Sequence, residues 1–297
     1  MKILVAVDGS SYSRMAIDFV ASRKTLLKSK SDIQVLNVQS PLPANPARVL
    51  GNQVVRKYYA EEAEAILKPV RDRFQKAGLN AIVRYVVGRP ASEISAAADK
   101  DNTDLVILGS QGHSALSGML LGSVTNEVLV RTKIPMLILR GDAKDFSDSL
   151  KVGIAVDGSS HSRAVVKYLL RHLEFFGANP QLTLINVVQD YALTLPSVES
   201  IVQPAFSESE VRKFQDESFE GAVKPARALL QKRGVLDANE VRLAGNPGDA
   251  LSAYAKKKLD LLVLGSHGHG AFKAAVMGSV AARVAARCSV PLLLVRD

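Results

Sequence analysis

The sequence predicts an α/β protein with two tandem domains, each a doubly wound parallel β-sheet covered by helices on both faces. First, the chain repeats itself, because the segment Val5–Ser11 (VAVDGSS) recurs as Ile154–Ser160 (IAVDGSS) about 150 residues later. Second, apolar strand-like runs alternate with segments of helical spacing in both copies. Third, both copies carry the spacing Gly-x2-Gly-x9-Gly-Ser after such a run. The period is that of a whole domain rather than of a short solenoid repeat.

Each copy is expected to contain five strands with helices between them. In the first copy, strands are expected at 2–7, 33–38, 81–87, 104–108 and 135–140, and helices at 11–28, 53–77, 91–100 and 118–131. In the second copy, strands are expected at 151–156, 181–187, 239–244, 260–264 and 291–295, and helices at 161–176, 208–233, 248–257 and 274–287. The strands are apolar almost throughout, which is typical of a parallel sheet buried on both faces.

The domain boundaries follow from the repeat. We expect domains at 1–141 and 150–297, joined by the polar, acidic linker 142–149. The second copy carries about seven extra residues, in or near Asp190–Ser207, between its second strand and its long helix. Because this insertion follows the second strand, it could cover a site there, and we expect the first domain to have the more open site.

Composition excludes several classes of protein. The chain has 297 residues, is 47% apolar and carries a net charge of +9. No apolar run approaches the ~18 residues of a membrane span, and the N-terminus has the pattern of a strand rather than of a signal peptide. The single cysteine, Cys288, permits no internal disulfide and favours the cytoplasm. The one dense basic run, Lys256–Lys258, lacks aromatic neighbours, so it indicates a solvated helix face rather than a specific nucleic-acid site.

A candidate site lies where the first and fourth strands end. Asp8 and Asp157 end the first strands, and the glycine-rich segments end the fourth strands. If these strands are neighbours, each aspartate faces a glycine-rich segment across one crevice. Glycines that open a helix leave backbone N–H groups exposed to a phosphate. The alternative is that each aspartate only caps the start of a helix. The spacing is made by Gly109, Gly112, Gly122 and Ser123 in the first copy and by Gly265, Gly268, Gly278 and Ser279 in the second.

The common catalytic and nucleotide motifs are missing. Neither a P-loop lysine nor a Gly-x-Gly-x2-Gly segment after a first strand is present, and no Ser-His-Asp arrangement is legible. His267 and His269 could indicate a metal, but they lack neighbouring cysteines or a carboxylate partner, and Gln111 stands in the first copy. We therefore expect a solvent-facing loop there, no metal ligands and no catalytic residues.

The chain resembles the universal stress proteins, as a tandem member of their ATP-binding branch. The resemblance covers nearly the whole chain and rests on the repeated glycine spacing together with the two first-strand aspartates. It implies five parallel strands per domain in the order 3-2-1-4-5, which places strands 1 and 4 side by side. One departure is that Asn37 and Asn186 stand where relatives often carry histidine before a valine.

The resemblance also implies roles for individual residues. Asp8 and Asp157 would contact the adenine and ribose of ATP, and the valines Val38 and Val187 would bind the adenine edge through their backbone. The ribose would pack on Gly109 and Gly265. The phosphates would be held by Gly112, Gly122, Ser123 and Val124 and by Gly268, Gly278, Ser279 and Val280. With no carboxylate placed for a metal, Mg²⁺ would be held mostly by phosphates and water. With no general base evident, ATP hydrolysis would be slow.

Three functions remain open at this point. The first is a cytoplasmic, ATP-binding, nucleotide-responsive stress regulator, with adenine nucleotide as its partner. The second is a slow ATP hydrolase or adenylate-forming enzyme, and the third is a nucleotide-free interaction module. Family members commonly dimerise through their last strands. Here the segments Pro135–Leu139 and Pro291–Val295 could pair within one chain as a pseudo-dimer, with a further homodimer left open.

Overall fold

The computed structural model divides into two compact units, residues 1–148 and 149–297, each of which is treated by itself below. It describes residues 1–23, 32–110, 121–141, 146, 149–188, 208–267 and 277–296. The candidate residues Gly112, Gly268 and His269, most of the linker and the insertion at 190–207 lie outside these ranges. Among the described helices, none combines the length and the apolar character needed to cross a bilayer.

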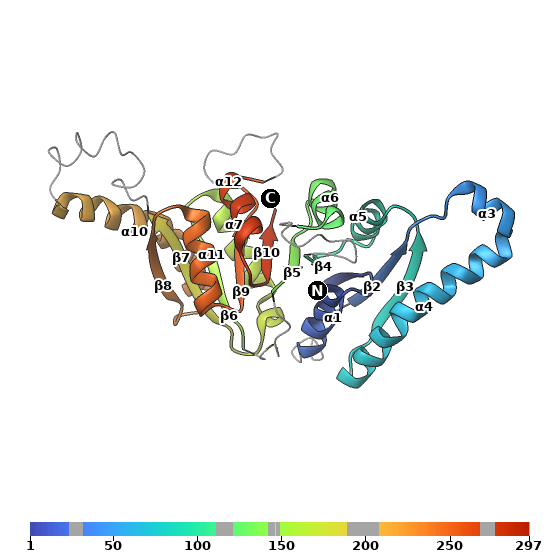
Figure 1. The fold of residues 1–297 in the computed structure, drawn as a ribbon. Helices are drawn as coiled ribbons and strands as arrows, with labels where there is room; N and C mark the ends of the chain where they lie inside the picture. The colour runs from blue at the N-terminus through green and yellow to red at the C-terminus, as the bar shows by residue number, and fades with distance from the viewer. Residues whose placement is uncertain are drawn as a thin grey trace. The chain divides into compact units, whose positions relative to one another are not determined.

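The first unit is built on a five-stranded, wholly parallel sheet. Its strands are β1 (Lys2–Val7), β2 (Asp32–Gln39), β3 (Ala81–Val87), β4 (Leu105–Gly109) and β5 (Met136–Leu139). They lie in the order β3-β2-β1-β4-β5 (Figure 1). In the register, Val5 lies beside Val35 on one side and Ile107 on the other, and all three are buried. The α/β class is confirmed, and strands 1 and 4 are neighbours as the resemblance implies.

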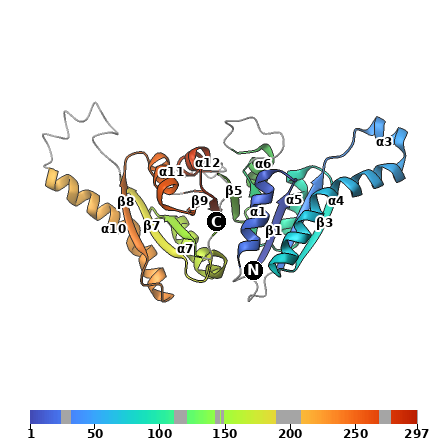
Figure 2. The same ribbon diagram turned by 60° about the horizontal axis from the view of Figure 1, so that its bottom comes forward.

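Two layers of helices cover this sheet (Figures 1 and 2). The helices are α1 (Ser11–Ser22), α3 (Ala44–Leu50), α4 (Asn52–Ala77), α5 (Pro90–Lys100) and α6 (Ser123–Arg131). Helix α1 packs on α4, and α5 packs on α6. Right-handed crossovers explain this pairing, because the connections β1→β2→β3 run one way across the sheet and β3→β4→β5 run the other way.

The second unit repeats the architecture. Its strands are β6 (Lys151–Ala155), β7 (Gln181–Val188), β8 (Asn239–Ala244), β9 (Leu261–Gly265) and β10 (Leu292–Val295), in the parallel order β8-β7-β6-β9-β10. Its helices are α7 (Ser160–Arg171), α10 (Glu208–Lys232), α11 (Pro247–Lys258) and α12 (Ser279–Arg287), with a short 3₁₀-helix, η1 (Leu173–Phe176). Helix α7 packs on α10, and α11 packs on α12.

The ends of several helices differ from the expected ones. Helix α1 stops at Ser22 rather than at 28, because Arg23 leaves helical geometry (ψ 77°) and its N–H bonds Val20. The segment expected as one helix at 161–176 is α7 followed by η1. Helices α6 and α12 begin at Ser123 and Ser279 rather than at 118 and 274, because Gly122 and Gly278 have extended backbone. Residues 118–120 and 274–276 are not among those described.

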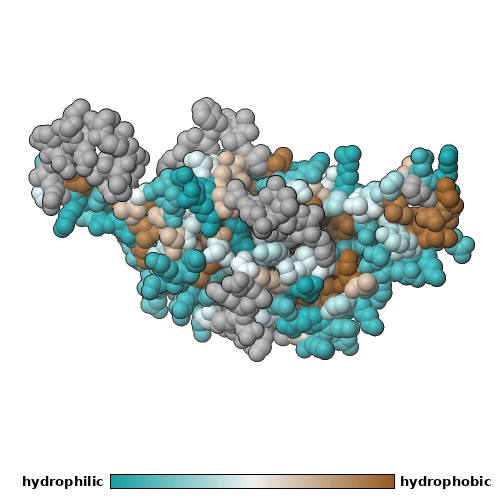
Figure 3. Space-filling view, in the orientation of Figure 1, coloured by the Kyte–Doolittle hydropathy of each residue, from teal (hydrophilic) through white to brown (hydrophobic). Residues whose placement is uncertain are grey.

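One helix in the first unit was not expected at all. Helix α3 precedes α4, and with the first turns of α4 it extends beyond the sheet (Figure 1). This part carries exposed apolar side chains, which form a brown patch in Figure 3. The strongly apolar ones are Val49, Leu50 and Val54, and the less hydrophobic Tyr58 is exposed as well.

Candidate functional site

The structure brings the two predicted halves of the site to the same edge of each sheet. Strands β1 and β4 are paired neighbours, and Asp8 and Gly109 stand at their carboxyl ends. In the second unit β6 pairs with β9, and Asp157 and Gly265 lie at the corresponding edge. This is the edge at which parallel α/β sheets bind ligands, where the strand order reverses.

The aspartates order the loops that follow the first strands. Asp8 Oδ1 accepts the N–H of Ser10 at 2.9 Å, and Asp157 Oδ1 accepts that of Ser159 at 3.0 Å. Between each pair lies a glycine with positive φ, 84° at Gly9, where a Cβ would strain the backbone. The N-caps themselves are serines, since Ser10 Oγ accepts the N–H of Ser13 at 3.2 Å. The aspartates are therefore not the N-caps of these helices, and the alternative that each aspartate only caps a helix is wrong.

The second strand of each unit projects past the first strand. Strand β1 ends opposite Asn37, whereas β2 continues through Val38 to Gln39 beside β3. Asp32 donates its N–H to Met1 O, so its backbone groups point toward β1. These groups alternate sides from one residue to the next along a strand, and Val38 lies an even number of residues after Asp32. Val38 therefore also directs its N–H and C=O toward the β1 side. The same alternation, starting from Gln181 N–H to Leu150 O, turns Val187 toward β6. Each valine thus offers a backbone donor and acceptor beyond the end of the first strand.

A buried asparagine clips the end of the first strand to the second, a feature that sequence reasoning missed. Asn37 Nδ2 donates to Val7 O at 2.8 Å, and Asn186 Nδ2 donates to Val156 O at 2.8 Å. In the first unit Gln39 Nε2 donates to Asn37 Oδ1 at 2.6 Å. In the second unit, nothing in the described part of the chain donates to Asn186 Oδ1. The available signal was an asparagine at the same position of the second strand in both copies.

The glycines that end the fourth strands have a packing reason of their own. A Cβ on Gly109 would lie 2.7 Å from Tyr12 Cβ, so α1 can approach β4 only if this residue is glycine. A Cβ on Gly265 would lie 2.9 Å from His267 O. In the first unit, Thr125 Oγ1 also donates to Gly109 O at 2.9 Å, whereas the repeat places Ala281 at that position in the second.

The helices that follow the glycine-rich segments begin without a capping side chain. Gly122 and Gly278 occupy the N-cap positions of α6 and α12, and a glycine has no side chain with which to cap the first N–H groups of its helix. By contrast, α1, α7 and α11 are capped by Ser10, Ser159 and Asn246. The first N–H groups of a helix have no intrahelical acceptor and carry partial positive charge, so uncapped N-termini are suited to an anion.

Backbone hydrogen bonds hold these helix starts at the strand ends. Gly122 donates its N–H to Ser110 O at 2.6 Å, and Gly278 donates to Ser266 O at 2.7 Å. Ser110 in turn donates to Leu139 O at 2.7 Å, which ties it to the neighbouring strand. The exposed Ser123 and Ser279 and the valines that follow them therefore stand at the edge that holds the aspartates. Sequence reasoning had not identified the two serines that accept these bonds.

Two histidines lie near each other in the second unit. The rings of His161 and His267 have centroids 6.1 Å apart, and His267 Nδ1 lies 3.0 Å from Ser266 Oγ. The repeat places Tyr12 and Gln111 at these positions in the first unit. Across the described residues, no group of three or more His, Cys, Asp or Glu side chains could hold a metal ion.

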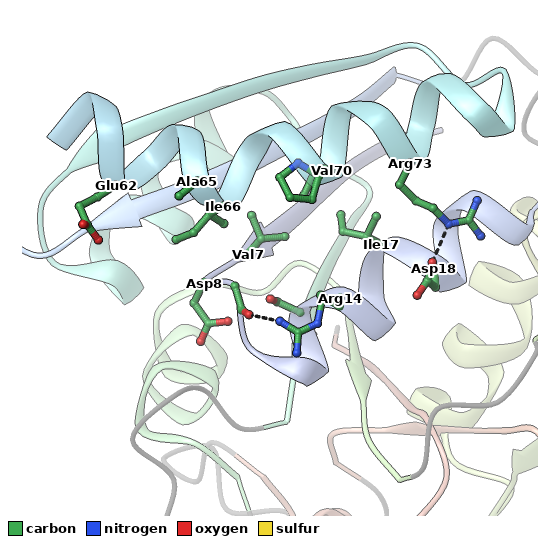
Figure 4. A pocket seen from close by; sticks show the side chains of 13 residues that line it. Val7, Asp8, Arg14, Ile17, Asp18, Glu62, Ala65, Ile66, Val70 and Arg73 are labelled. Atoms are coloured by element: carbon green, nitrogen blue, oxygen red, sulfur yellow. Dashed lines mark hydrogen bonds and ion pairs between the residues drawn. The ribbon is translucent and has the colours of Figure 1, made fainter. Parts of the chain in front are cut away.

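A pocket lies beside the candidate site in the first unit, between α1 and α4 (Figure 4). It encloses about 500 Å³, and Asp8 and Gly9 form part of its lining. Most of the remaining lining comes from α1 and α4, which contribute both apolar and charged side chains. Sequence reasoning did not predict it, because it depends on how closely two helices separated in sequence approach each other.

Comparison with known proteins agrees with this architecture. The model of the universal stress protein family matches residues 1–140 and 150–296. A universal stress protein of Mycolicibacterium smegmatis is 27% identical over 99% of this chain and 96% of its own length. A universal stress protein of Bacillus subtilis is 29% identical and matches 47% of this chain over 98% of its own length.

A solved structure of a universal stress protein from Archaeoglobus fulgidus shares the fold with a TM-score of 0.67, at 22% identity over 99% of this chain and 98% of that one. The family match extends over both sheets and over each of the strand-end loops described above. The chain belongs to the universal stress protein family and carries two of its domains in tandem.

Proposed function

We propose that this protein binds ATP at the strand ends of both domains and acts as a nucleotide-responsive stress regulator. The observation that carries the proposal is the pair of helices, α6 and α12, that begin at a glycine without a capping side chain. Each start is fixed by backbone bonds beside an ordered aspartate loop. A free helix N-terminus at the carboxyl edge of a parallel sheet is a recurrent phosphate site.

The proposed contacts would orient the nucleotide along the strand ends. The adenine edge would meet the backbone N–H and C=O of Val38 or Val187, which lie beyond the end of the first strand. The ribose would lie between the aspartate loop and the glycine that ends the fourth strand. The phosphates would meet the N–H groups and hydroxyl at Ser123 and Val124, or at Ser279 and Val280. Gly112 and Gly268 complete the proposed phosphate side. Mg²⁺ would be held by the phosphates and water.

Binding rather than turnover is the function that these groups serve. The proposed phosphate contacts in the first domain are backbone N–H groups and a serine hydroxyl, which stabilise negative charge. Neither group is a base that would activate water at neutral pH. We therefore propose that occupancy by ATP, rather than its hydrolysis, carries the signal.

The proposal is tested on protein purified without added nucleotide. Mass spectrometry of the small molecules released on denaturation should find adenine nucleotide. Adding ATP with Mg²⁺ at about 100 times Kd should stabilise the fold by about 2.7 kcal/mol, seen as a rise in Tm that GTP does not reproduce. Protein that carries no nucleotide and whose Tm ignores millimolar ATP would instead favour the interaction module.

We also propose that the chain is a cytoplasmic pseudo-dimer, with the edge strands of its two sheets paired within one molecule. The proposal rests on the two similar apolar last strands, 135–139 and 291–295, which each need a partner. Hydrogen exchange at the last strands should then be equally slow in dilute and in concentrated protein. Protection of these strands that falls on dilution would favour pairing between molecules instead.

A further inference from the structure

We propose that the first domain holds a second ligand site, the pocket between α1 and α4, which takes a small apolar molecule with an amine head group. Its volume of about 500 Å³ lies within the range of small-molecule pockets, roughly 300–1,000 Å³. Figure 4 shows apolar side chains from both helices and the end of β1 facing this space. Those labelled are Val7, Ile17, Ile66 and Val70, and Pro69 also lines the pocket.

The two ends of the pocket differ in chemistry. At one end, Arg73 Nε lies 2.6 Å from Asp18 Oδ1, an ion pair that joins α4 to α1. At the other end lie the carboxylates of Asp8 and Glu62 (Figure 4). The guanidinium of Arg14 donates to the carbonyl of Gly9, so it is turned to the backbone of the loop. The polar head of a ligand would therefore lie at the end that holds Asp8.

Pro69 adds a backbone acceptor to this pocket. A proline within a helix has no N–H, so the carbonyl of the residue four positions earlier, Ala65, loses its helical donor. Ala65 and Pro69 both line the pocket. In the second unit the equivalent carbonyl, that of Gly221, lies 3.2 Å from a Cβ placed on Gly158, so it faces the loop after the first strand. By the repeat, Ala65 O is expected to face the loop that contains Gly9.

The charged side chains that line the pocket favour a positively charged head group on the ligand. The lining carries the carboxylates of Asp8, Asp18 and Glu62 against the guanidinium groups of Arg14 and Arg73, an excess of one negative charge. Together with the Ala65 carbonyl, these groups favour a ligand that donates hydrogen bonds and carries positive charge. A carboxylate or phosphate head group would be repelled. The preference is thus opposite to that of the proposed phosphate site.

The second domain lacks the features that define this pocket. The repeat replaces Asp18 and Arg73 by Lys167 and Leu229, so the closing ion pair is lost. It also replaces Ala65 and Ile66 by smaller residues, Gly221 and Ala222. There the backbone of α10 lies against the loop, since a Cβ on Gly158 would be 3.2 Å from Ala222 Cα. The second domain therefore serves as an internal control.

The test compares three probes of one chain length, namely hexylamine, hexanol and hexanoate, on the full chain. Methyl NMR should show hexylamine shifting Ile17, Ile66 and Val70 but not Val166 of the second domain. Hexylamine should bind about threefold tighter than hexanol, because one exposed charge pair contributes a binding free energy of about that size. Hexanoate should bind more weakly than both. Hexanoate binding as tightly as hexylamine, or equal shifts in both domains, would overturn the proposal.

Variants then locate the probe. Ala65→Phe should abolish the hexylamine shifts, whereas Ala60→Phe, which adds the same bulk to an exposed position of α4, should leave them unchanged. Glu62→Gln should reduce the ratio of the affinity for hexylamine to the affinity for hexanol. This variant also tests the position of the amine head group if Ala65→Phe does not fold. Hexylamine shifts that persist in Ala65→Phe, or an unaltered preference in Glu62→Gln, would contradict the site.

An ATP titration of the same variants separates this site from the proposed nucleotide site. Ala65→Phe should bind ATP as the parent does. If it loses ATP together with hexylamine, the pocket is the adenine subsite and the inference of a second site is wrong. If neither variant nor parent binds ATP while hexylamine still binds, the proposed function fails and the pocket stands.

Discussion

At the scale of single residues, the polar clips at the strand ends decide how the candidate site is held. Asn37 and Asn186 make the same bond to the last carbonyl of the first strand, at 2.8 Å in each unit. Both are buried, but only Asn37 has a donor for its Oδ1, Gln39, among the described residues. A buried acceptor without a partner costs free energy that a satisfied one does not.

This difference predicts unequal effects of the same substitution. Asn37→Leu should destabilise the first domain by about 1–3 kcal/mol, because it leaves both Val7 O and Gln39 Nε2 without a partner. Asn186→Leu should cost less, because it also removes an acceptor that has no donor among the described residues. Native-state hydrogen exchange resolves the two domains. An equal or larger loss of stability in Asn186→Leu would refute this account of the clips.

The sequence allowed part of this site to be predicted at the residue scale, and the structure shows why the rest was missed. Asp8, Asp157 and the glycines could be identified because glycine and aspartate leave a repeated signature in one short segment. The asparagine clips and the serine carbonyls act through partners far along the chain, so spacing alone does not reveal them. Gly109 had a second reason to be glycine, its contact with Tyr12, that only the packing shows.

At the scale of elements, two arginines join the long helix of the second unit to the edge strand β8, since Arg242 pairs with Asp216 and Arg227 pairs with Glu240. Arg227 on α10 donates to Glu220, two turns earlier on the same face of the helix, at 2.7 Å, and to Glu240 on β8, at 2.6 Å. The hydrogen bond from Arg227 holds the pKa of Glu220 below its ordinary value. The stability linked to Glu220 is therefore present above its unfolded-state pKa and is lost as pH falls through the lowered folded-state value.

Removing the arginine should remove this pH dependence. In Arg227→Gln the pKa of Glu220 should rise toward its ordinary value, followed by NMR titration of the carboxylate. The acid side of the stability profile, below about pH 4.5, should become shallower, because the folded and unfolded pKa values converge. Arg233→Gln, a change just beyond the end of α10, is the control. A titration of Glu220 that is the same in Arg227→Gln and the parent would show that the arginine is not the cause.

Two glycines near this helix should respond to alanine in opposite directions. A Cβ on Gly221, inside α10, meets nothing within 4 Å, so Gly221→Ala should stabilise the second domain by about 0.5–1 kcal/mol. Gly158 has φ 80° and its Cβ would lie 3.2 Å from Ala222 Cα, so Gly158→Ala should destabilise. Urea unfolding measures both. Destabilisation by Gly221→Ala would contradict the open space beside α10.

Strand and helix identities were predictable at this scale, whereas several helix ends were not. Apolar runs of five to seven residues identified most strands, since a sheet buried on both faces tolerates little else. The edge strand β8 instead mixes apolar and charged residues, and four of its six positions are exposed. The starts of α6 and α12 were misplaced because the glycine-rich segments before them also fit helical spacing, and the extended backbone at Gly122 and Gly278 is set by bonds to Ser110 and Ser266. Helix α3 is short and lacks a strong periodic pattern.

At the scale of the whole molecule, the two domains share the structure of their strand ends and differ elsewhere. Both domains keep the aspartate loop, the projecting second strand and the uncapped helix start. They differ in the side chains between the first helix and the long helix, where the first domain has its pocket. The tandem fold could be predicted because the repeat is recognisable in the amino-acid sequence. The pocket could not, because it depends on how closely two helices approach.

The central claim is that the glycine-started helices of both domains bind the phosphates of ATP. Gly122 has an extended backbone (φ −61°, ψ 155°) that any residue adopts, so a larger side chain adds bulk without backbone strain. Gly122→Val should therefore block the first site and leave the second, and Gly278→Val should do the reverse.

Isothermal titration calorimetry of ATP into the parent and these variants is the direct measurement. The account predicts two sites per chain in the parent, one in each single variant and none in the double variant. Two filled sites in Gly122→Val, with the fold intact by circular dichroism, would contradict it.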